Sequence, residues 1–75
     1  MIAPSPITND GALRAIAERP HTTDALRLRF SCSRNQASAA IQFLVAGGEI
    51  ASTNHPDGVA YRITERGRRA LEGRS

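Results

Sequence analysis

The feature that most constrains the fold is the stretch SRNQASAAIQFLVAGGEI, residues 33–50, because the spacing of its apolar residues changes along its length. Up to Ala46 the apolar positions recur every three or four residues, which is typical of a helix with one buried face. After Gly47 and Gly48 short, β-branched segments with an alternating pattern begin, which indicates β-strands. The sequence therefore predicts a helix that leads directly into a strand.

A helical wheel divides the residues of this helix into two faces. At about 100° per residue, the apolar side chains gather on one side and are predicted to seat the helix on the core. Ser33 is predicted to cap the start of the helix, and Gly47 or Gly48 to end it with a left-handed backbone. The predicted buried positions are Ala37, Ala40, Ile41 and Leu44, and the opposite side carries Asn35, Gln36, Ala39, Gln42 and Phe43.

A β-hairpin is predicted to follow. The segments EIAST (49–53) and VAYRIT (59–64) are β-branched, and NHPDG (54–58) between them is rich in turn-forming residues. A two-stranded hairpin is marginal on its own in water, so it has to pack on the helices. In the second strand, one face is predicted to carry Val59, Tyr61 and Ile63, and the other Ala60, Arg62 and Thr64.

Two shorter helices are predicted upstream. The first lies in TNDGALRAIAERP, where Thr8, Asn9 or Asp10 supplies the cap and Pro20 ends the helix. The second lies in HTTDALRLRF, where Thr22 or Thr23 supplies the cap. Its predicted core anchor is Leu26, its remaining buried residues are Leu28 and Phe30, and its outward residues are Arg27 and Arg29.

A last helix, ERGRRALEG, is predicted after Thr64, with Leu71 packing back on the core. Residues 1–8, which contain two prolines, are predicted to form a flexible arm, and residues 9–72 a single domain. The predicted fold class is therefore mostly α with a small β-hairpin: a three-helix core, a two-stranded hairpin and a short C-terminal helix.

The composition argues against several classes of function. The chain has 75 residues, a net charge of +3 and one cysteine, Cys32, so an internal disulfide is excluded. No long apolar run and no signal peptide is present, which favours a soluble cytoplasmic protein. His21 and His55 are read as loop residues, and Cys32 as a packed residue rather than a reactive thiol. We expect no metal site, no cofactor and no small-molecule ligand.

Catalysis has no support in the sequence. No nucleophile is paired with a base at a recognisable spacing, and no glycine-rich phosphate loop is present. A chain of this length also has little room for a buried pocket. The sequence therefore predicts a binding protein and not an enzyme.

Two segments resemble the winged helix-turn-helix family of bacterial regulators, which includes MarR-like, PadR-like and ArsR-like proteins. The first runs from Ser33 through Ile41, Leu44, Gly48 and Ile50, and is similar to the family's serine-capped recognition helix and the start of its wing. The second, residues 61–71, is similar to the Tyr-x-Leu-Thr-x-x-Gly-x-x-x-Leu ending of many members. The resemblance covers about residues 9–72 and implies a winged helix-turn-helix fold.

The resemblance also implies a double-stranded DNA partner, with the third helix, about Ser33–Ala46, in the major groove. The side chains implied to contact bases are Arg34, Asn35, Gln36, Ser38 and Ala39. Those implied to contact the DNA backbone are Thr22, Thr23, Arg27, Arg29, Ser33, Gln42 and Arg62. Arg66, Arg68 and Arg69 form the densest basic cluster, which is either a further phosphate contact or a solvated helix face.

The sequence departs from the family at the wing and on the third helix. The tip NHPDG has no arginine or lysine, so only Asn54 and His55 are available for the minor groove. Phe43 lies near the outward face; it either folds back under the first helix or is an exposed anchor for another protein. Phe43 and Leu71 are therefore candidate protein-interface residues.

The function predicted from these features is a sequence-specific transcriptional regulator of a bacterium, phage or plasmid. It would act as a repressor, as a homodimer on a palindromic site, in the cytoplasm and associated with the nucleoid. The alternative is a winged-helix module for protein–protein contacts, which would bind a polymerase, another regulator or a nuclease without reading DNA itself. The acidic wing and Phe43 favour the alternative, and the distribution of arginines favours DNA.

Overall fold

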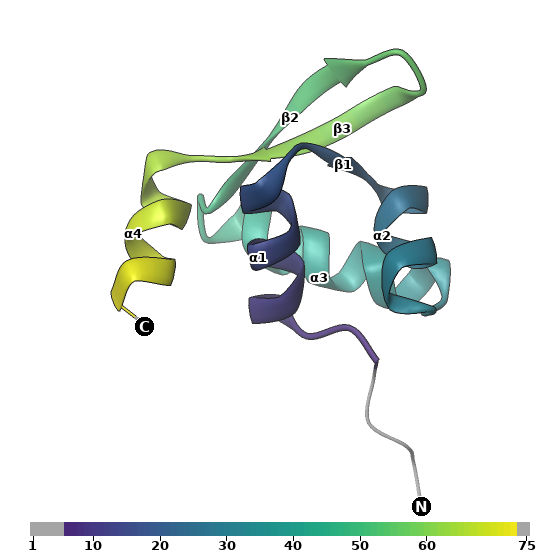
Figure 1. The fold of residues 1–75 in the computed structure, drawn as a ribbon, viewed down its shortest axis with the longest axis horizontal. Helices are drawn as coiled ribbons and strands as arrows, with labels where there is room; N and C mark the ends of the chain where they lie inside the picture. The colour runs from purple at the N-terminus through teal and green to yellow at the C-terminus, as the bar shows by residue number, and fades with distance from the viewer. Residues whose placement is uncertain (1–5, 74–75) are drawn as a thin grey trace, which may run out of the picture.

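The computed structural model describes residues 6–73, in which helices support a small three-stranded sheet. Figure 1 shows the hairpin of β2 and β3 lying along one side of the helices, with α4 at the end of the sheet away from α2. The helices are α1 (Asn9–Glu18), α2 (Thr23–Phe30), α3 (Arg34–Ala46) and α4 (Glu65–Gly73). The strands are β1 (His21–Thr22), β2 (Ile50–His55) and β3 (Gly58–Ile63).

Each helix begins at a hydroxyl side chain that accepts a hydrogen bond from a backbone N–H of the first turn, as N-caps do. These caps are Thr8 for α1, Thr22 for α2, Ser33 for α3 and Thr64 for α4. The chain leaves α1 at Arg19, directly before Pro20, in extended geometry. At the end of α3, Gly48 takes the left-handed backbone with φ of 71°. The sequence placed all four helices within a few residues of these bounds.

The core lies between α1, α2, α3 and the base of the hairpin. Leu13, Ile16, Leu26 and Leu44 are the largest fully buried side chains. The predicted inner face of α3, including Ala37, Ala40 and Ile41, is buried as expected. Among the described residues, no helix is long and apolar enough to cross a membrane.

The structure contains a strand that the sequence did not predict. β1 pairs antiparallel with β3, joining His21 to Tyr61 and Thr22 to Ala60, so the strand order is β1-β3-β2. β1 has only two residues, which are too few to show the alternation of apolar and polar side chains that identifies a strand. The chain is extended here because Pro20 ends α1. His21, predicted as a loop residue, is therefore a buried strand residue with 3% of its surface exposed.

The extra strand also decides which residues of the hairpin are buried. β3 is the central strand, and Ala60, which pairs with Thr22 on one side and Thr53 on the other, is fully buried. Val59 is 57% exposed because the hairpin there extends toward its turn, beyond the end of the core. Leu28, predicted to be buried, is 71% exposed, and the half-buried Phe30 packs against the core in its place.

The N-terminal arm is shorter than predicted at its C-terminal end. Ile7 is buried among the core residues, and Thr8 is the cap of α1. Residues 1–5 of the predicted arm lie outside the described residues, and Pro6 is exposed. The packed domain therefore includes Ile7.

Candidate nucleic-acid interface

The exposed face of α3 is polar in its N-terminal half. Arg34, Asn35, Ala39 and Gln42 are exposed, while Gln36 and Ser38 are half-buried. The buried side of the helix packs on the core, so this face points away from the rest of the protein. Such a face presents amide, hydroxyl and guanidinium groups, which are the groups that recognise base edges in DNA.

The start of α3 is fixed by a capping box. The Ser33 hydroxyl accepts a hydrogen bond from the backbone N–H of Gln36 at 3.1 Å, and the side-chain oxygen of Gln36 accepts one from the backbone N–H of Ser33 at 3.0 Å. A two-bond contact with adenine needs both the oxygen and the NH₂ group of an amide. While the cap is intact, Gln36 therefore offers its NH₂ group alone.

Asp24 joins the first turns of α2 and α3. Its carboxylate accepts a hydrogen bond from the guanidinium of Arg34 at 3.0 Å and lies 3.6 Å from Nε of Arg27. Arg34 remains 69% exposed, so its guanidinium is oriented by Asp24 without being enclosed. Two of the predicted DNA-contacting arginines thus come together around one carboxylate. The sequence did not predict this arrangement of charges.

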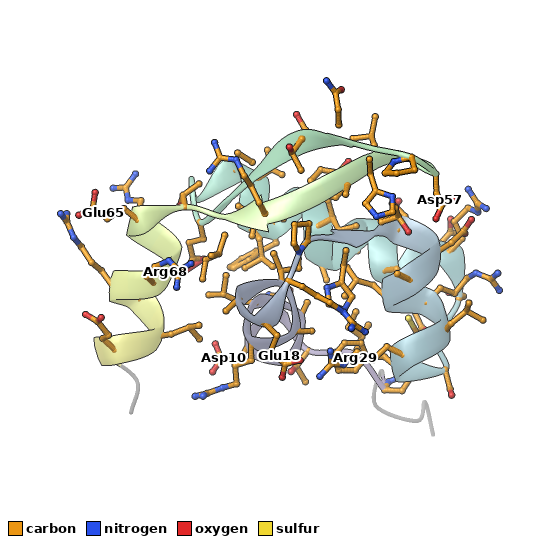
Figure 2. All side chains as sticks on the ribbon, turned by 45° about the horizontal axis from the view of Figure 1, so that its top comes forward. Asp10, Glu18, Arg29, Asp57, Glu65 and Arg68 are labelled. Carbon is orange, nitrogen blue, oxygen red and sulfur yellow. The ribbon has the colours of Figure 1, made fainter. Side chains whose placement is uncertain are left out.

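Arg29 lies on a different side of α2 from Arg27, because residues two apart in a helix point about 200° away from each other. Its guanidinium binds the carboxylate of Glu18 on α1 through two hydrogen bonds of 2.8 and 3.2 Å (Figure 2). The hydrogen bond from Arg29 lowers the pKa of Glu18, and the same bond raises the pKa of Arg29. To bind a DNA phosphate, Arg29 would have to leave Glu18.

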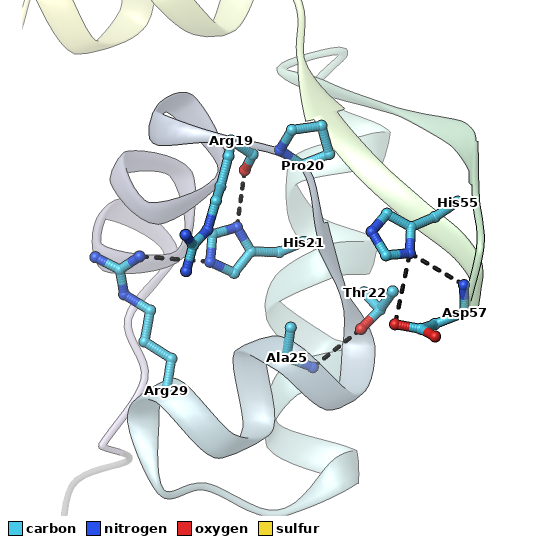
Figure 3. Close-up of a pocket in the computed structure, with 8 residues that line it drawn as sticks. All are labelled: Arg19, Pro20, His21, Thr22, Ala25, Arg29, His55 and Asp57. Atoms are coloured by element: carbon cyan, nitrogen blue, oxygen red, sulfur yellow. Dashed lines mark hydrogen bonds and ion pairs between the residues drawn. The ribbon is translucent and has the colours of Figure 1, made fainter.

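Arg29 also lines a hollow of about 470 Å³ between β1, α2 and the hairpin turn (Figure 3). Within it, the His21 ring hydrogen-bonds the backbone oxygen of Arg19 through Nδ1 at 2.8 Å, and Nε2 faces the Arg29 guanidinium at 3.4 Å. The His21 imidazole therefore carries its proton on Nδ1 when neutral. Apart from Arg19, the polar side chains that line this hollow bind one another or the backbone.

The tip of the wing is closed by its own contacts. The backbone N–H of Asp57 donates to Nδ1 of His55 at 3.1 Å, and the Asp57 carboxylate lies 3.8 Å from the same nitrogen. Asn54 and His55 are exposed, as a contact with DNA requires. Asp57 is 83% exposed and adds negative charge beside them.

Arg62 lies on the opposite face of β3 from Tyr61, because side chains alternate along a strand. Tyr61 borders a hollow with Gln42, Val45 and Ala46 of α3, so it marks the face of the sheet toward α3. Arg62 instead borders one hollow with the end of α1 and with α4, and another with Ser52, Thr53, Asn54 and Val59 of the hairpin. The structure therefore does not bring Arg62 together with the predicted contacts of α3.

The C-terminal half of α3 is apolar where it is exposed. Phe43 is 58% exposed, so of the two positions predicted for it the exposed one is found. Val45 is 45% exposed and borders the hollow of about 430 Å³ between α3 and the sheet. Leu71, the other predicted interface residue, is half-buried and packs against the core.

The remaining predicted site residues are buried or half-buried parts of the fold. Thr22 and Thr23 are half-buried at the start of α2, where Thr22 is the cap. Cys32 is buried and is a free thiol. Within residues 6–73, no cluster of three or more His, Cys, Asp or Glu side chains has the arrangement needed to hold a metal ion.

The fold is similar to that of a solved transcriptional regulator. The structure of the transcriptional regulator BldR from Sulfolobus solfataricus matches this chain with a TM-score of 0.79 and 25% sequence identity. The match covers 87% of this chain and 49% of BldR, so the chain spans about half the length of that protein. No protein-family model and no curated protein matches the sequence. The winged-helix fold that the sequence predicted is confirmed.

Proposed function

We propose that the protein is a transcriptional regulator that binds double-stranded DNA with α3 in the major groove. The observation that carries the proposal is the exposed polar face at the start of α3, on a fold that matches a transcriptional regulator. In helix-turn-helix proteins the N-terminal part of the second helix of the motif faces the base edges. The proposal places the first two turns of α3 there.

The five proposed base-contacting side chains have distinct roles. Arg34 would exchange the carboxylate of Asp24 for the O6 and N7 atoms of a guanine, and Asn35 would pair with an adenine. Gln36 would donate from its NH₂ group while its oxygen stays in the cap. Ser38 and Ala39, one turn further on, would contact a base edge and a thymine methyl group.

Phosphate contacts would supply most of the affinity. Backbone N–H groups at the start of α3, with the hydroxyl of Ser33, are well placed because a helix N-terminus attracts anions. Arg27 would contribute from α2 after release from Asp24. The other proposed contacts of this kind are Thr22, Thr23, Gln42 and, on the wing, Asn54 and His55. Arg29 would join them only by giving up Glu18.

One such domain reads only a few base pairs, so we propose that a homodimer occupies a palindromic site and acts as a repressor there. The protein would then work in the cytoplasm of a bacterium, or of the host of a phage or plasmid, on the nucleoid. The exposed Phe43 is the candidate contact between the two copies.

The proposal is tested by enriching random duplexes on the purified protein and measuring the affinity for the enriched and for scrambled duplexes at low and moderate salt. We expect binding to weaken steeply with salt, because each neutralised phosphate contributes a slope of about −0.9 in log K against log salt concentration. Absence of binding to any duplex at low salt would refute the proposal.

The assignment of bases is tested with Asn35→Ala and with Gln36→Glu. Loss of a two-bond base contact costs about 1–3 kcal/mol, so Asn35→Ala should lower affinity for the enriched duplex by roughly 5- to 160-fold. Gln36→Glu retains an oxygen for the capping box but removes the NH₂ donor, so helix stability serves as its internal control. Unchanged selectivity in both variants would show that α3 does not read the bases.

A second candidate function is a module that binds another protein. The exposed Phe43 and Val45 favour it, together with the hollow between α3 and the sheet. In that case Phe43→Gln would abolish capture of the partner, and the protein would bind duplex DNA no more tightly than a scrambled control at every salt concentration.

A further inference from the structure

A second basic surface lies between α1, β3 and α4. It surrounds a hollow of about 370 Å³ whose lining includes Arg19 after α1, Arg62 on β3 and Arg68 on α4. Figure 2 shows the side chain of Arg68 extending from α4 toward α1. No residue of α3 lines this hollow. Three arginines from three separate elements thus converge on a surface that the α3 site does not use.

The arginines of this surface carry uncompensated charge. Among residues 6–73, Arg19, Arg62 and Arg68 form no ion pair, whereas Arg27, Arg29, Arg34 and Arg69 each form one. The acidic residue in the lining is Glu18, and its carboxylate is bound by Arg29 at 2.8 Å. Of the five arginines in residues 6–73 that form no ion pair, three therefore meet here and none lies on α3.

The lining indicates what kind of anion fits. Between the arginines the hollow is formed by Ile16, Ala17, Pro20 and Ile63, which offer no side-chain hydrogen-bond donors. These open apolar residues do not enclose a compact anion. Separate exposed guanidinium groups can instead bind successive phosphates of a DNA backbone. The lining also lacks amide and hydroxyl side chains, so it offers none of the neutral hydrogen-bonding groups that distinguish base edges.

We propose that Arg19, Arg62 and Arg68 form a second, sequence-independent surface for the backbone of duplex DNA, so that one molecule holds two duplex segments at once. The first segment lies on α3, and in this respect the inference rests on the proposed function. The hollow of this surface shares no lining residue with the hollow beside α3, so the second segment lies apart from that hollow.

The inference is tested by a bridging assay with the full chain. An immobilised enriched duplex is saturated with protein, and a fluorescent duplex of unrelated sequence is added at low salt. We expect the wild-type protein to retain the fluorescent duplex. The variant Arg19→Gln/Arg62→Gln/Arg68→Gln should lose this retention while keeping its preference for the enriched duplex. Its slope of log K against log salt concentration on unrelated DNA should fall by up to about 0.9 for each arginine removed.

A charge-matched control separates this surface from net charge. Arg14→Gln/Arg66→Gln/Arg69→Gln also removes three positive charges from exposed positions, but none of these residues lines the hollow. We expect this control to bridge as the wild type does. All six arginines are exposed, so circular dichroism should show both variants folded.

Each outcome bears on one of the two proposals. Bridging that survives the triple substitution, or is lost equally in the control, overturns the second surface. Wild-type protein that binds the enriched duplex but retains no second duplex also overturns it, and leaves the proposed function standing. Bridging that is lost only in the triple variant supports the second surface, even if Asn35→Ala and Gln36→Glu show that α3 does not read bases.

Discussion

Gly67 is the position in α4 at which a side chain has no space. A Cβ atom there would collide with the backbone oxygen of Glu49 and lie 2.8 Å from Cγ1 of Ile63. The main chain at Glu49 cannot move aside easily, because its oxygen also accepts the backbone N–H of Thr64 at 3.0 Å. The glycine therefore allows α4 to approach the base of the hairpin.

We expect Gly67→Ala to lower the free energy of unfolding by about 1–3 kcal/mol, since overpacking forces the backbone to shift. Denaturation in urea would measure the change. Gly73→Ala in the same helix is the control, because a Cβ atom there meets nothing within 4 Å. It should be neutral or slightly stabilising, because alanine favours a helix. Equal stability of the two variants would show that α4 does not pack as closely as described.

Asp24 is the residue that restrains the arginines beside α3. Its carboxylate binds Arg34 at 3.0 Å and lies 3.6 Å from Arg27, and in the proposed complex both arginines would leave it to contact DNA. Asp24→Asn removes this competition and also a negative charge that repels DNA. We expect it to strengthen binding to unrelated duplexes, with a salt slope steeper by about 0.9 for each arginine that gains a phosphate. Because binding to unrelated duplexes becomes stronger, the ratio of affinity for the enriched duplex to affinity for unrelated duplexes should fall.

Binding measured by fluorescence anisotropy would test this expectation against Glu72→Gln. That control removes the same charge from an exposed site on α4. Equal strengthening in both variants would mean that Asp24 acts only through net charge and does not restrain Arg34.

The pair of Glu18 and Arg29 links α1 to α2 and makes that link sensitive to acid. Arg29 lowers the pKa of Glu18 below its ordinary value of 4.5 in the folded protein. The unfolded chain then binds a proton more readily than the folded chain, so stability contributed by this pair is complete above about pH 4.5 and is lost as the pH falls through the lowered pKa. The link should therefore weaken only in acid.

We expect Glu18→Gln to lower stability at pH 7 and to leave it almost unchanged, relative to the wild type, at pH 2–3. Urea denaturation midpoints across that range would show the two curves converging in acid. Because both side chains are largely exposed, high salt should reduce the difference at pH 7. Parallel curves at all pH values would show that the ion pair does not hold α1 and α2 together.

The elements that were predicted correctly are those with strong local signals. The caps at Thr8, Ser33 and Thr64, the stop at Pro20 and the glycines after α3 act within a few residues, so the sequence alone reveals them. β1 was missed because its two residues are held by pairing with β3, which is distant in the chain. The exposure of Leu28 was missed for a different reason: α2 is short, and its alternating Leu-Arg-Leu-Arg-Phe run gave no clear helical face.

The arrangement of charge over the whole molecule could not be predicted in the same way. The sequence identified the arginines but not their partners, and pairing decides which of them can bind a phosphate. Arg29 turns to Glu18, eleven residues away, and Arg34 to Asp24, ten residues away. Arg19 was not among the DNA contacts predicted from the sequence. It becomes a candidate phosphate contact only because α4 and β3 bring Arg68 and Arg62 beside it. The candidate residues of α3 remain predictions, since their role depends on a partner.

The homodimer that we propose is argued at the scale of the whole molecule, with Phe43 as its candidate contact. A side chain that is 58% exposed contributes little to the monomer, so Phe43→Gln should change the free energy of unfolding by less than about 1 kcal/mol. Burying the exposed part of the ring between two copies would contribute roughly 1–2 kcal/mol for each ring. We therefore expect Phe43→Gln to weaken the dimer by at least about tenfold.

Sedimentation equilibrium over a range of protein concentrations would measure the dimer. Leu28→Gln is the control, because Leu28 is 71% exposed on α2 and its loss removes similar apolar surface away from Phe43. If Leu28→Gln weakens the dimer and Phe43→Gln does not, the two copies meet through α2. If neither variant changes the dissociation constant, the contact lies at α1 or α4, and the exposed ring of Phe43 is then free to bind a different protein.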